Sequence, residues 1–408
     1  MFSYFNSALS ATTQRFLNFE MGCGDEKSLN KIFSSSLNIH ILLAILVFIF
    51  LETVGLWLLN NYIVIPESRI DISNIVYQFS VFTTVIQIIT IPYSALIIAH
   101  ENMSVFAYIS IFEVLLKLIG VILLQFIVGD KLLEYSLVIF IVMSLGRLLY
   151  VIYSRLKYVE SKYRFIIDIS LLKEMFQFTG WNFLGATAGI VMNQGVNIML
   201  NMFFGPVVNA SRAIAIQVQQ AFAQLATNFT TAINPQIVKS YSSGDKNRME
   251  ELAIASSKYT FLIVAATSMP FLIKMDFVLQ LWLGEVPQGA SSFTKLMLLY
   301  QLTLCLTYSL NMSSQASGNV KLFQIVESIT LLLIIPLGFV ELKLGMSPNI
   351  VLSTQVLLSF LAIFLRLKVL RKIINFNSKE FVIKVLARSI PVVLCYILIY
   401  IISFYIVP

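Results

Sequence analysis

Charge, cysteine and histidine are scarce in this chain. Only 12% of its 408 residues are charged, whereas a soluble globular domain carries about 25%. Its three cysteines (Cys23, Cys305 and Cys395) and two histidines are too scattered for a metal site or a disulfide framework. The chain also has no glycine loop for phosphates, no zinc-ligand spacing and no serine elbow. We therefore expect no cofactor, no catalytic residue and no enzyme activity.

Long apolar runs take the place of charge. Hydrophobic residues make up 58% of the sequence, and its mean hydropathy is +0.84. Runs of about 20 apolar residues recur along the whole length, and each can cross a bilayer as a helix. The sequence therefore predicts an all-α polytopic membrane protein with about twelve transmembrane helices. The predicted helices are 1–18, 37–59, 73–99, 104–127, 131–153, 177–204, 207–233, 256–281, 293–316, 322–343, 348–369 and 383–407.

The basic residues lie in loops between these helices. The net charge of +7 could suggest a nucleic-acid partner, but alternate loops hold fifteen Lys and Arg residues and the intervening loops hold only Arg69, Lys131 and Lys343. This imbalance follows the positive-inside rule, under which basic loops stay in the cytoplasm. We therefore expect a multi-pass protein of the inner (plasma) membrane with cytoplasmic basic loops and no nucleic-acid partner.

Two segments share one layout. QRFLNFEMGCGDEKSLNKIFSSS (14–36) and NPQIVKSYSSGDKNRMEELAIASS (234–257) each begin at a helix end, pass through Gly-Asp and continue as a polar helix. Asn102 and Asn319 are separated by nearly the same number of residues as the two Gly-Asp pairs, and each lies between two predicted helices. Because Gly-Asp is a common turn, chance is the alternative to duplication. A duplication predicts two parallel lobes, which is a transporter architecture. We assign an incomplete N-terminal lobe, a C-terminal lobe and an additional transmembrane helix to 1–160, 161–370 and 371–408.

Amide side chains recur in the predicted helices 177–204 and 207–233, which form a hairpin around Gly205-Pro206. The first helix has asparagines at every fourth residue beside one glutamine: Asn193, Gln194, Asn197 and Asn201. The second helix has amides at steps of three and four residues: Gln217, Gln220, Gln224 and Asn228. These steps place the recurring amides of each helix on one face.

Two interpretations of these amide rows remain open. Small and polar residues join membrane helices, and Gly185 and Gly189, four residues apart, support such packing. However, amides over about three turns exceed what one packing contact needs, and lipid does not tolerate such a row. We favour a water-filled cavity in which the amides hydrogen-bond a polar substrate such as a sugar.

Ionisable residues inside predicted helices are the other candidate functional groups. Arg212 can snorkel to the outer interface or attract an anionic head group. Glu113 and Lys117, four residues apart, can neutralise each other or relay a proton or cation. Glu52 is an intramembrane acid and thus a candidate for binding a coupling ion, whereas Arg147 lies within snorkelling reach of the cytoplasm. Glu52, Glu113, Lys117 and Arg147 form our candidate ion-coupling or charge network.

Three segments carry a resemblance to a known family. They are SALSATTQRFLNFEMGCGDEKSLNKIF, IPYSALIIAHENMSVFAYISIFEVLLKLIGV and the hairpin from NQGVNIMLNMFFGP to VKSYSSGD. They resemble the O-antigen-type polysaccharide-biosynthesis flippases of the multidrug/oligosaccharidyl-lipid/polysaccharide (MOP) exporter superfamily, which is MATE-like. The resemblance covers essentially the whole chain, and the hairpin is its most specific part.

The resemblance implies a fold, a substrate and partners. It implies two six-helix bundles around a V-shaped cavity. It also implies that an undecaprenyl-pyrophosphate-linked oligosaccharide crosses the inner membrane by alternating access, for lipopolysaccharide, O-antigen or capsular polysaccharide biosynthesis. The implied partners are this substrate, membrane lipid and polysaccharide assembly proteins. Such proteins have a complete helix before SALSATTQRF and another after a span such as 383–407, so we expect this chain to lack the first and last helices of the family.

Two other functions were weighed against the flippase. A MATE-type cation-coupled multidrug antiporter of the same architecture needs a buried acid, but the hairpin carries amides and Arg212 without Asp or Glu. This composition favours an anionic or neutral polar substrate. A membrane enzyme such as a polysaccharide polymerase or glycosyltransferase needs a long catalytic loop, and the predicted outer loops are short.

Overall fold

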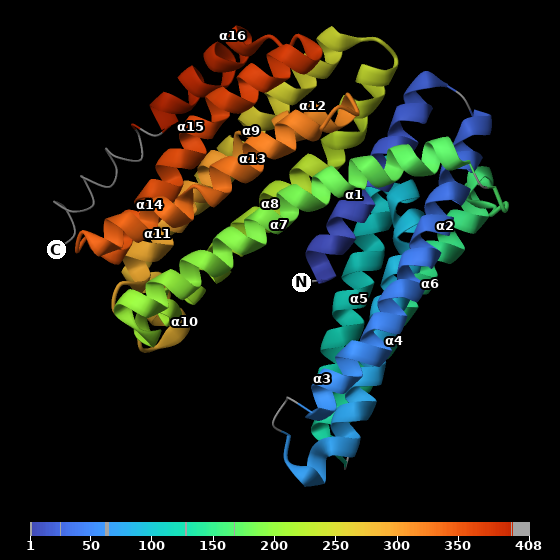
Figure 1. Cartoon of the computed structure of the whole chain (residues 1–408), viewed down its shortest axis with the longest axis horizontal. Coiled ribbons are helices and arrows are strands. Elements are labelled where there is room, and N and C mark those ends of the chain that lie inside the picture. The colour runs from blue at the N-terminus through green and yellow to red at the C-terminus, as the bar shows by residue number, and fades with distance from the viewer. Residues whose placement is uncertain are drawn as a thin grey trace. The chain divides into compact units, whose positions relative to one another are not determined.

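The chain forms two compact helical units, Met1–Thr179 and Gly180–Pro408 (Figure 1). The structure is a computed structural model that describes residues 2–24, 26–61, 65–126, 129–166, 168–392 and 394. Within these residues all regular elements are helices. The expected all-α class is therefore confirmed. Most of the predicted span 383–407 lies outside the described residues, and so does Cys395.

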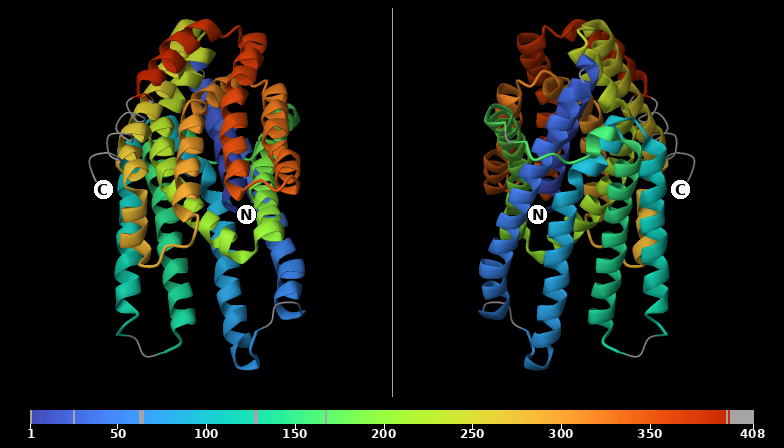
Figure 2. Two further views of the ribbon diagram at one scale, coloured as in Figure 1. Left: turned by 90° about the vertical axis from the view of Figure 1, so that its left-hand side faces the viewer. Right: turned by 90° about the vertical axis from the view of Figure 1, so that its right-hand side faces the viewer.

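The N-terminal unit is built around one long helix, α4. Its elements are α1 (Phe2–Cys23), α2 (Glu26–Phe50), η1 (Leu51–Gly55), α3 (Leu56–Asn61), η2 (Glu67–Arg69), α4 (Ile70–Ala99), α5 (Met103–Leu123), α6 (Lys131–Lys157), η3 (Val159–Ser161) and the first part of α7 (Ile169–Phe204). Helix α4 packs against α1, α2 and α6, and α5 packs against α6 (Figures 1 and 2). The second half of α4 is buried on nearly all sides because these neighbours surround it.

The C-terminal unit is organised around α8 and α15. Its elements are the rest of α7, α8 (Pro206–Ser242), α9 (Lys246–Ile273), α10 (Met275–Leu283), α11 (Ala290–Cys305), α12 (Tyr308–Ala316), α13 (Lys321–Leu332), α14 (Ile334–Lys343), α15 (Pro348–Ile374), α16 (Ser378–Phe381) and η4 (Val382–Leu386). Helix α8 packs against α9, α11 and α12, and α15 packs against α11, α13 and α14. Phe222, Met249, Phe261 and Leu298 belong to the main core between these helices.

Helix ends follow from local chemistry. Gly205 has φ of 79° and precedes Pro206, the first residue of α8, because glycine tolerates the left-handed region and proline suits a helix start. At the next turn Gly244 has φ of 85°, and the Asp245 carboxylate accepts a hydrogen bond from the Arg248 backbone N–H at 3.0 Å, which caps α9.

The backbone supports the predicted duplication. Gly24 and Gly244, the two Gly-Asp glycines, both have left-handed φ values, 78° and 85°. The residues before Asn102 and Asn319 share this feature, with φ of 60° at Glu101 and 75° at Gly318. Asp25, the other half of the first Gly-Asp pair, lies outside the described residues. Equivalent turns in both halves are what two parallel repeats require.

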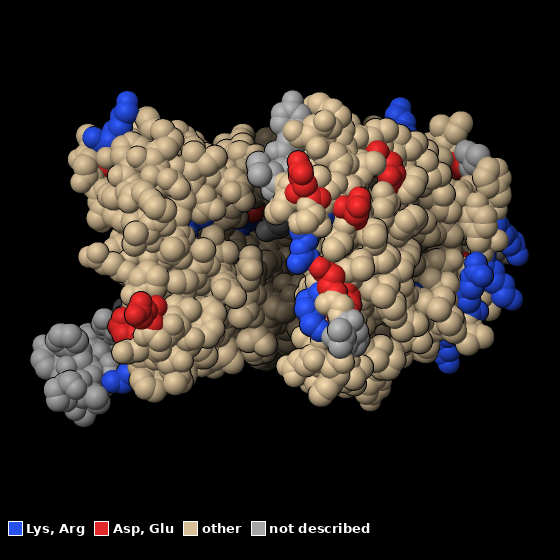
Figure 3. Space-filling view, turned by 90° about the horizontal axis from the view of Figure 1, so that it is seen from below, with Lys and Arg blue, Asp and Glu red and all other residues tan. Residues whose placement is uncertain are grey.

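Among the described residues, eight helical segments are long and apolar enough to cross a membrane. They correspond to eight of the predicted spans. The predicted spans 1–18, 207–233 and 293–316 are helical but are not among the eight. The amides of α8 lower its hydropathy, and a turn between α11 and α12 divides 293–316. On the face drawn in Figure 3, acidic and basic residues occupy a small part of the surface, as expected for a multi-span membrane protein.

The two units divide within α7, after Thr179, and not at 160/161. The loop before α7 is bound to α2: the Asn30 side chain donates to the carbonyl oxygens of Glu160 at 2.9 Å and Lys162 at 2.7 Å, and Asn38 donates to that of Ile166 at 2.9 Å. These contacts keep the loop in the N-terminal unit. The assignment of transport lobes to 1–160, 161–370 and 371–408 stays a prediction.

Candidate functional site

A row of amide side chains lies on the exposed face of α8. Gln217, Gln220, Gln224 and Asn228 are all exposed. The opposite face of α8 is buried through small and apolar residues such as Ala215, Phe222 and Ala226, which fixes the rotation of the helix. The Gln224 side chain donates to Asn228 Oδ1 at 2.8 Å, so these two amides order each other. The prediction from their spacing that these amides share one face of the helix is confirmed.

The amides of α7 do not form a comparable row. Gln194 and Asn201 are exposed, but Asn193 and Asn197 are only partly so because both contact Arg212 of α8. Arg212 donates to Asn197 Oδ1, to the Asn193 carbonyl oxygen at 3.2 Å and to Asn193 Oδ1 at 3.3 Å. Two of the four predicted cavity residues on α7 therefore hold a guanidinium within the C-terminal unit.

Arg212 neither snorkels nor reaches solvent. Its side chain is 0% exposed, and among the described residues no carboxylate lies within ion-pair distance of it. Its Nε atom has no hydrogen-bond partner in the described part of the chain. The placement of Arg212 at the interface is therefore corrected, because it joins α7 to α8; a role in attracting an anionic head group stays a prediction.

A second buried arginine was not singled out in the sequence. Arg366 of α15 is 3% exposed and forms a two-point ion pair with Glu327 of α13, with both N···O distances at 2.6 Å. Such fork-to-fork pairs are among the strongest charge-assisted contacts. In the sequence, Arg366 lies near the end of the predicted span 348–369, where an arginine is expected at the cytoplasmic end of a helix, so its burial was not apparent.

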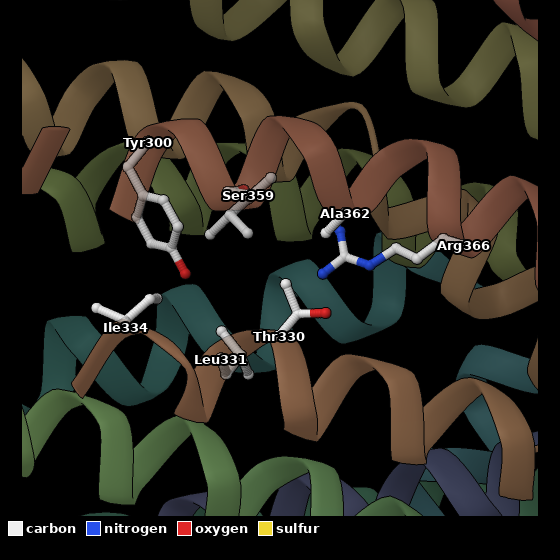
Figure 4. Close-up of a pocket in the computed structure, with 8 residues that line it drawn as sticks. Tyr300, Thr330, Leu331, Ile334, Ser359, Ala362 and Arg366 are labelled. Atoms are coloured by element: carbon white, nitrogen blue, oxygen red, sulfur yellow. The ribbon is translucent and has the colours of Figure 1, made fainter. Parts of the chain in front are cut away.

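A small cavity adjoins Arg366 in the C-terminal unit (Figure 4). It is lined by Tyr300, Thr330, Ser359, Ala362 and Arg366 among others, and its volume is about 10 Å³. That volume suits about one water molecule. The cavity is too small for a sugar or a drug, so the exposed row on α8 is the better candidate for substrate contact.

The predicted Glu113–Lys117 pair is wrong. Glu113 of α5 instead lies 3.4 Å from the Arg147 guanidinium of α6, and Lys117 is exposed. A Cβ on Gly146 would lie 1.8 Å from Glu113 Oε1, so this glycine lets the carboxylate approach α6. Arg147, expected to snorkel, is thus a partner of Glu113 and stacks over the Tyr150 ring at 5.2 Å.

Glu52 lies in a π-helical turn, η1, within the span Ser28–Asn61. The Gln78 side chain donates to Glu52 Oε2 at 3.1 Å, and the Tyr77 hydroxyl donates to the Leu51 carbonyl oxygen at 2.7 Å. Among the described residues Glu52 Oε1 has no hydrogen-bond partner. Turns of this type often occur at functional sites, and the ion-coupling role of Glu52 stays a prediction.

Comparisons with known proteins place the fold. No protein-family model matches the chain, and no curated protein does. Among solved structures, a MATE point mutant aligns with a TM-score of 0.81 at 11% identity over 93% of this chain and 85% of that chain. An outward-facing multidrug-resistance MATE transporter of the MOP superfamily gives 0.79 at 11% identity with the same coverages, 93% and 85%.

A third solved structure with a similar fold is also a transporter. A MOP-superfamily transporter from Pyrococcus furiosus, described as having a binding pocket of reverse polarity, aligns with a TM-score of 0.77 at 12% identity over 93% of this chain and 85% of that chain. These neighbours are transporters and not enzymes. At such identities the similarity establishes the fold and leaves the substrate open. The chain therefore has the MATE-like fold of MOP-superfamily transporters.

Proposed function

We propose that this protein is a membrane exporter that moves a lipid-linked oligosaccharide from the cytoplasmic to the outer leaflet by alternating access. The basic loops would lie in the cytoplasm and the protein in the inner membrane. The observation that carries this proposal is the exposed amide row on α8. Amides can donate and accept hydrogen bonds without a fixed charge, which suits the many hydroxyl groups of a sugar chain.

The physical environment of the row supports a polar ligand. A polar side chain that faces the hydrocarbon of a bilayer loses its hydrogen bonds to water, which costs free energy. Such side chains therefore need water, protein or a polar ligand beside them. Gln217, Gln220, Gln224 and Asn228 are exposed along about three turns of α8. The face they form is therefore expected to meet water or substrate during transport.

The alternative is a cation-coupled multidrug antiporter, and the acids of the chain weigh against it. Glu113 is paired with Arg147 and Glu327 with Arg366, so two of the intramembrane acids already have cationic partners. Glu52 remains without an arginine or lysine partner among the described residues. The amide row itself offers no negative charge to an organic cation.

The test is a double substitution of the row, Gln220→Leu with Gln224→Leu. In cells whose surface polysaccharide depends on this protein, we expect the polysaccharide to fall about thirtyfold, because the two substitutions remove two hydrogen bonds of about 1 kcal/mol each. Gln280→Leu is the matched control, since Gln280 is an exposed amide of α10 outside the row. Wild-type polysaccharide in a normally expressed double variant would contradict the proposal, as would a gain or loss of drug resistance alone.

Loop orientation is tested separately. Single cysteines introduced at Lys162 and Asp130 into a chain without native cysteines should react differently with a membrane-impermeant maleimide on intact cells. The site at Asp130 should be labelled and the one at Lys162 protected; the reverse pattern would invert the proposed topology.

A further inference from the structure

An apolar groove lies beside the amide row. It runs between α8, α9 and α10 in the C-terminal unit and has a volume of about 670 Å³, which is within the usual range for small-molecule sites. Its lining includes Val218, Phe222, Leu225, Phe271, Met275 and Trp282. Met275 and Phe222 are buried and form its floor, whereas Leu225 and Trp282 are 44% and 48% exposed at its edges.

The groove and the amide row share one edge of α8. Successive residues of a helix are rotated by about 100°, so Gln220, Gln224, Gln217 and Asn228 fill one sector. Ala221, Leu225, Val218 and Phe222 fill the adjoining sector. Gln217 itself lines the groove. Neighbouring rows on a helix have Cβ atoms about 5–6 Å apart, so one elongated molecule could contact both surfaces at once.

We propose that the groove binds the apolar chain of the lipid-linked substrate while its sugars contact the amide row. This inference rests on the proposed function and names a second subsite for it. No Lys, Arg, Asp or Glu is among the described residues that line the groove, so it favours a hydrocarbon chain over a charged ligand. Only an amphipathic molecule would gain from the polar row and the groove together.

The same unit provides a matched control surface. A second groove between α7 and α13 has a volume of about 640 Å³. It is lined by Phe183, Leu184, Val191, Ile325, Ile329 and Leu332 among others, and no amide side chain is among its described lining residues. Val191 of the control groove is 46% exposed and Leu225 of the groove beside the amide row is 44% exposed, so a label at either position is equally accessible. A surface that merely contacts bulk lipid would behave alike in both grooves.

The first test blocks each groove with a large side chain. Ala221→Trp fills the groove beside the amide row, and Val191→Trp fills the control groove. In the polysaccharide-dependent cells, we expect Ala221→Trp to lower surface polysaccharide about tenfold, comparable to losing about 1.4 kcal/mol of binding. Val191→Trp should leave it unchanged. Equal effects of the two tryptophans at equal membrane expression would overturn the groove assignment.

The second test uses crosslinking and does not depend on transport. A photoreactive benzoyl-phenylalanine at position 225 should capture a fluorescent undecaprenyl-pyrophosphate-linked oligosaccharide, and the same group at 191 should not. A fluorescent phosphatidylglycerol should label both positions equally. Equal capture of the oligosaccharide probe at 225 and 191 would overturn the inference.

The outcomes separate the inference from the proposed function. Loss of polysaccharide in the Gln220/Gln224 double variant with normal export in Ala221→Trp would retain the flippase and reject the groove. Normal export in both variants would reject both. Loss in both, with capture at 225 alone, is the result that we expect.

Discussion

Arg212 shows how a buried charge can join two membrane helices without an acid. Its guanidinium is held by the side chains of Asn193 and Asn197 and by the Asn193 carbonyl oxygen. Hydrogen bonds to a charged group contribute more than neutral ones, about 1.5–3 kcal/mol each. Removing an acceptor leaves the buried cation short of partners, which costs more than removing the cation itself.

This argument gives a stability prediction for Asn197. Asn197→Ala should destabilise the protein by about 2 kcal/mol, seen as a lower Tm in detergent. Asn201→Ala, one turn further along α7 at an exposed position, is the control and should change stability by less than about 0.5 kcal/mol. Equal Tm values for the two variants would show that Asn197 does not stabilise the guanidinium.

Glu327 and Arg366 allow a double-substitution test. Glu327→Gln should cost about 3 kcal/mol, because it leaves Arg366 buried beside a neutral partner, whereas Glu327→Leu with Arg366→Met should recover most of that loss. The exposed pair Lys384–Glu380, with side chains 47% and 32% exposed, is the comparison. Breaking it with Glu380→Gln should cost under about 1 kcal/mol. Calorimetry that finds no recovery in the double variant would refute this account of the pair.

Spacing in the sequence predicted what one helix does by itself and failed where two helices meet. The amide row of α8 was foreseen because its residues share one face of one helix. The involvement of Asn193 and Asn197 with Arg212, the pairing of Glu113 with Arg147, and Arg366 with Glu327 were not foreseen. Each depends on which side chain a neighbouring helix presents, and periodicity within a single helix has no information about that.

The start of α7 provides a pH prediction at the scale of an element. Asp168 Oδ1 accepts hydrogen bonds from the backbone N–H groups of Ser170 at 2.9 Å and Leu171 at 3.0 Å, and Lys31 Nζ lies 2.5 Å from Oδ2. The hydrogen bond from Lys31 holds the pKa of Asp168 well below its usual range, helped by one from the Ser170 hydroxyl at 2.6 Å and one from the Leu171 backbone N–H. The resulting stability is full above the usual pKa of about 3.9 and is lost as the pH falls toward the folded-state pKa.

Asp168→Asn keeps a side chain that can cap α7 but removes the ion pair. Its Tm should therefore be below that of the wild type at about pH 7, and the gap should narrow at about pH 3. Asp276→Asn is the control, because its carboxylate is 79% exposed and 3.7 Å from Lys295. A gap that is constant with pH would exclude the proposed titration of Asp168.

At the scale of the whole molecule, apolar length and loop charge predicted the helical class and most of the spans, because both are set by the bilayer and do not require knowledge of tertiary contacts. The MATE-like fold was predicted from the resemblance to the exporter family and not from composition. The sequence did not reveal the division within α7, since that division depends on hydrogen bonds from Asn30 and Asn38 to a loop more than a hundred residues away. The fold leaves the substrate open, because substrate choice resides in a few exposed side chains.

The most direct test of the flippase proposal is transport in a purified system. The full chain would be reconstituted into liposomes containing a fluorescent undecaprenyl-pyrophosphate-linked oligosaccharide, and the fraction of probe exposed on the other leaflet would be followed with an impermeant quencher. We predict that the wild-type chain moves the probe at least about tenfold faster than the Gln220/Gln224 double leucine variant. Equal rates for both, or movement of an organic cation in place of the oligosaccharide lipid, would contradict it.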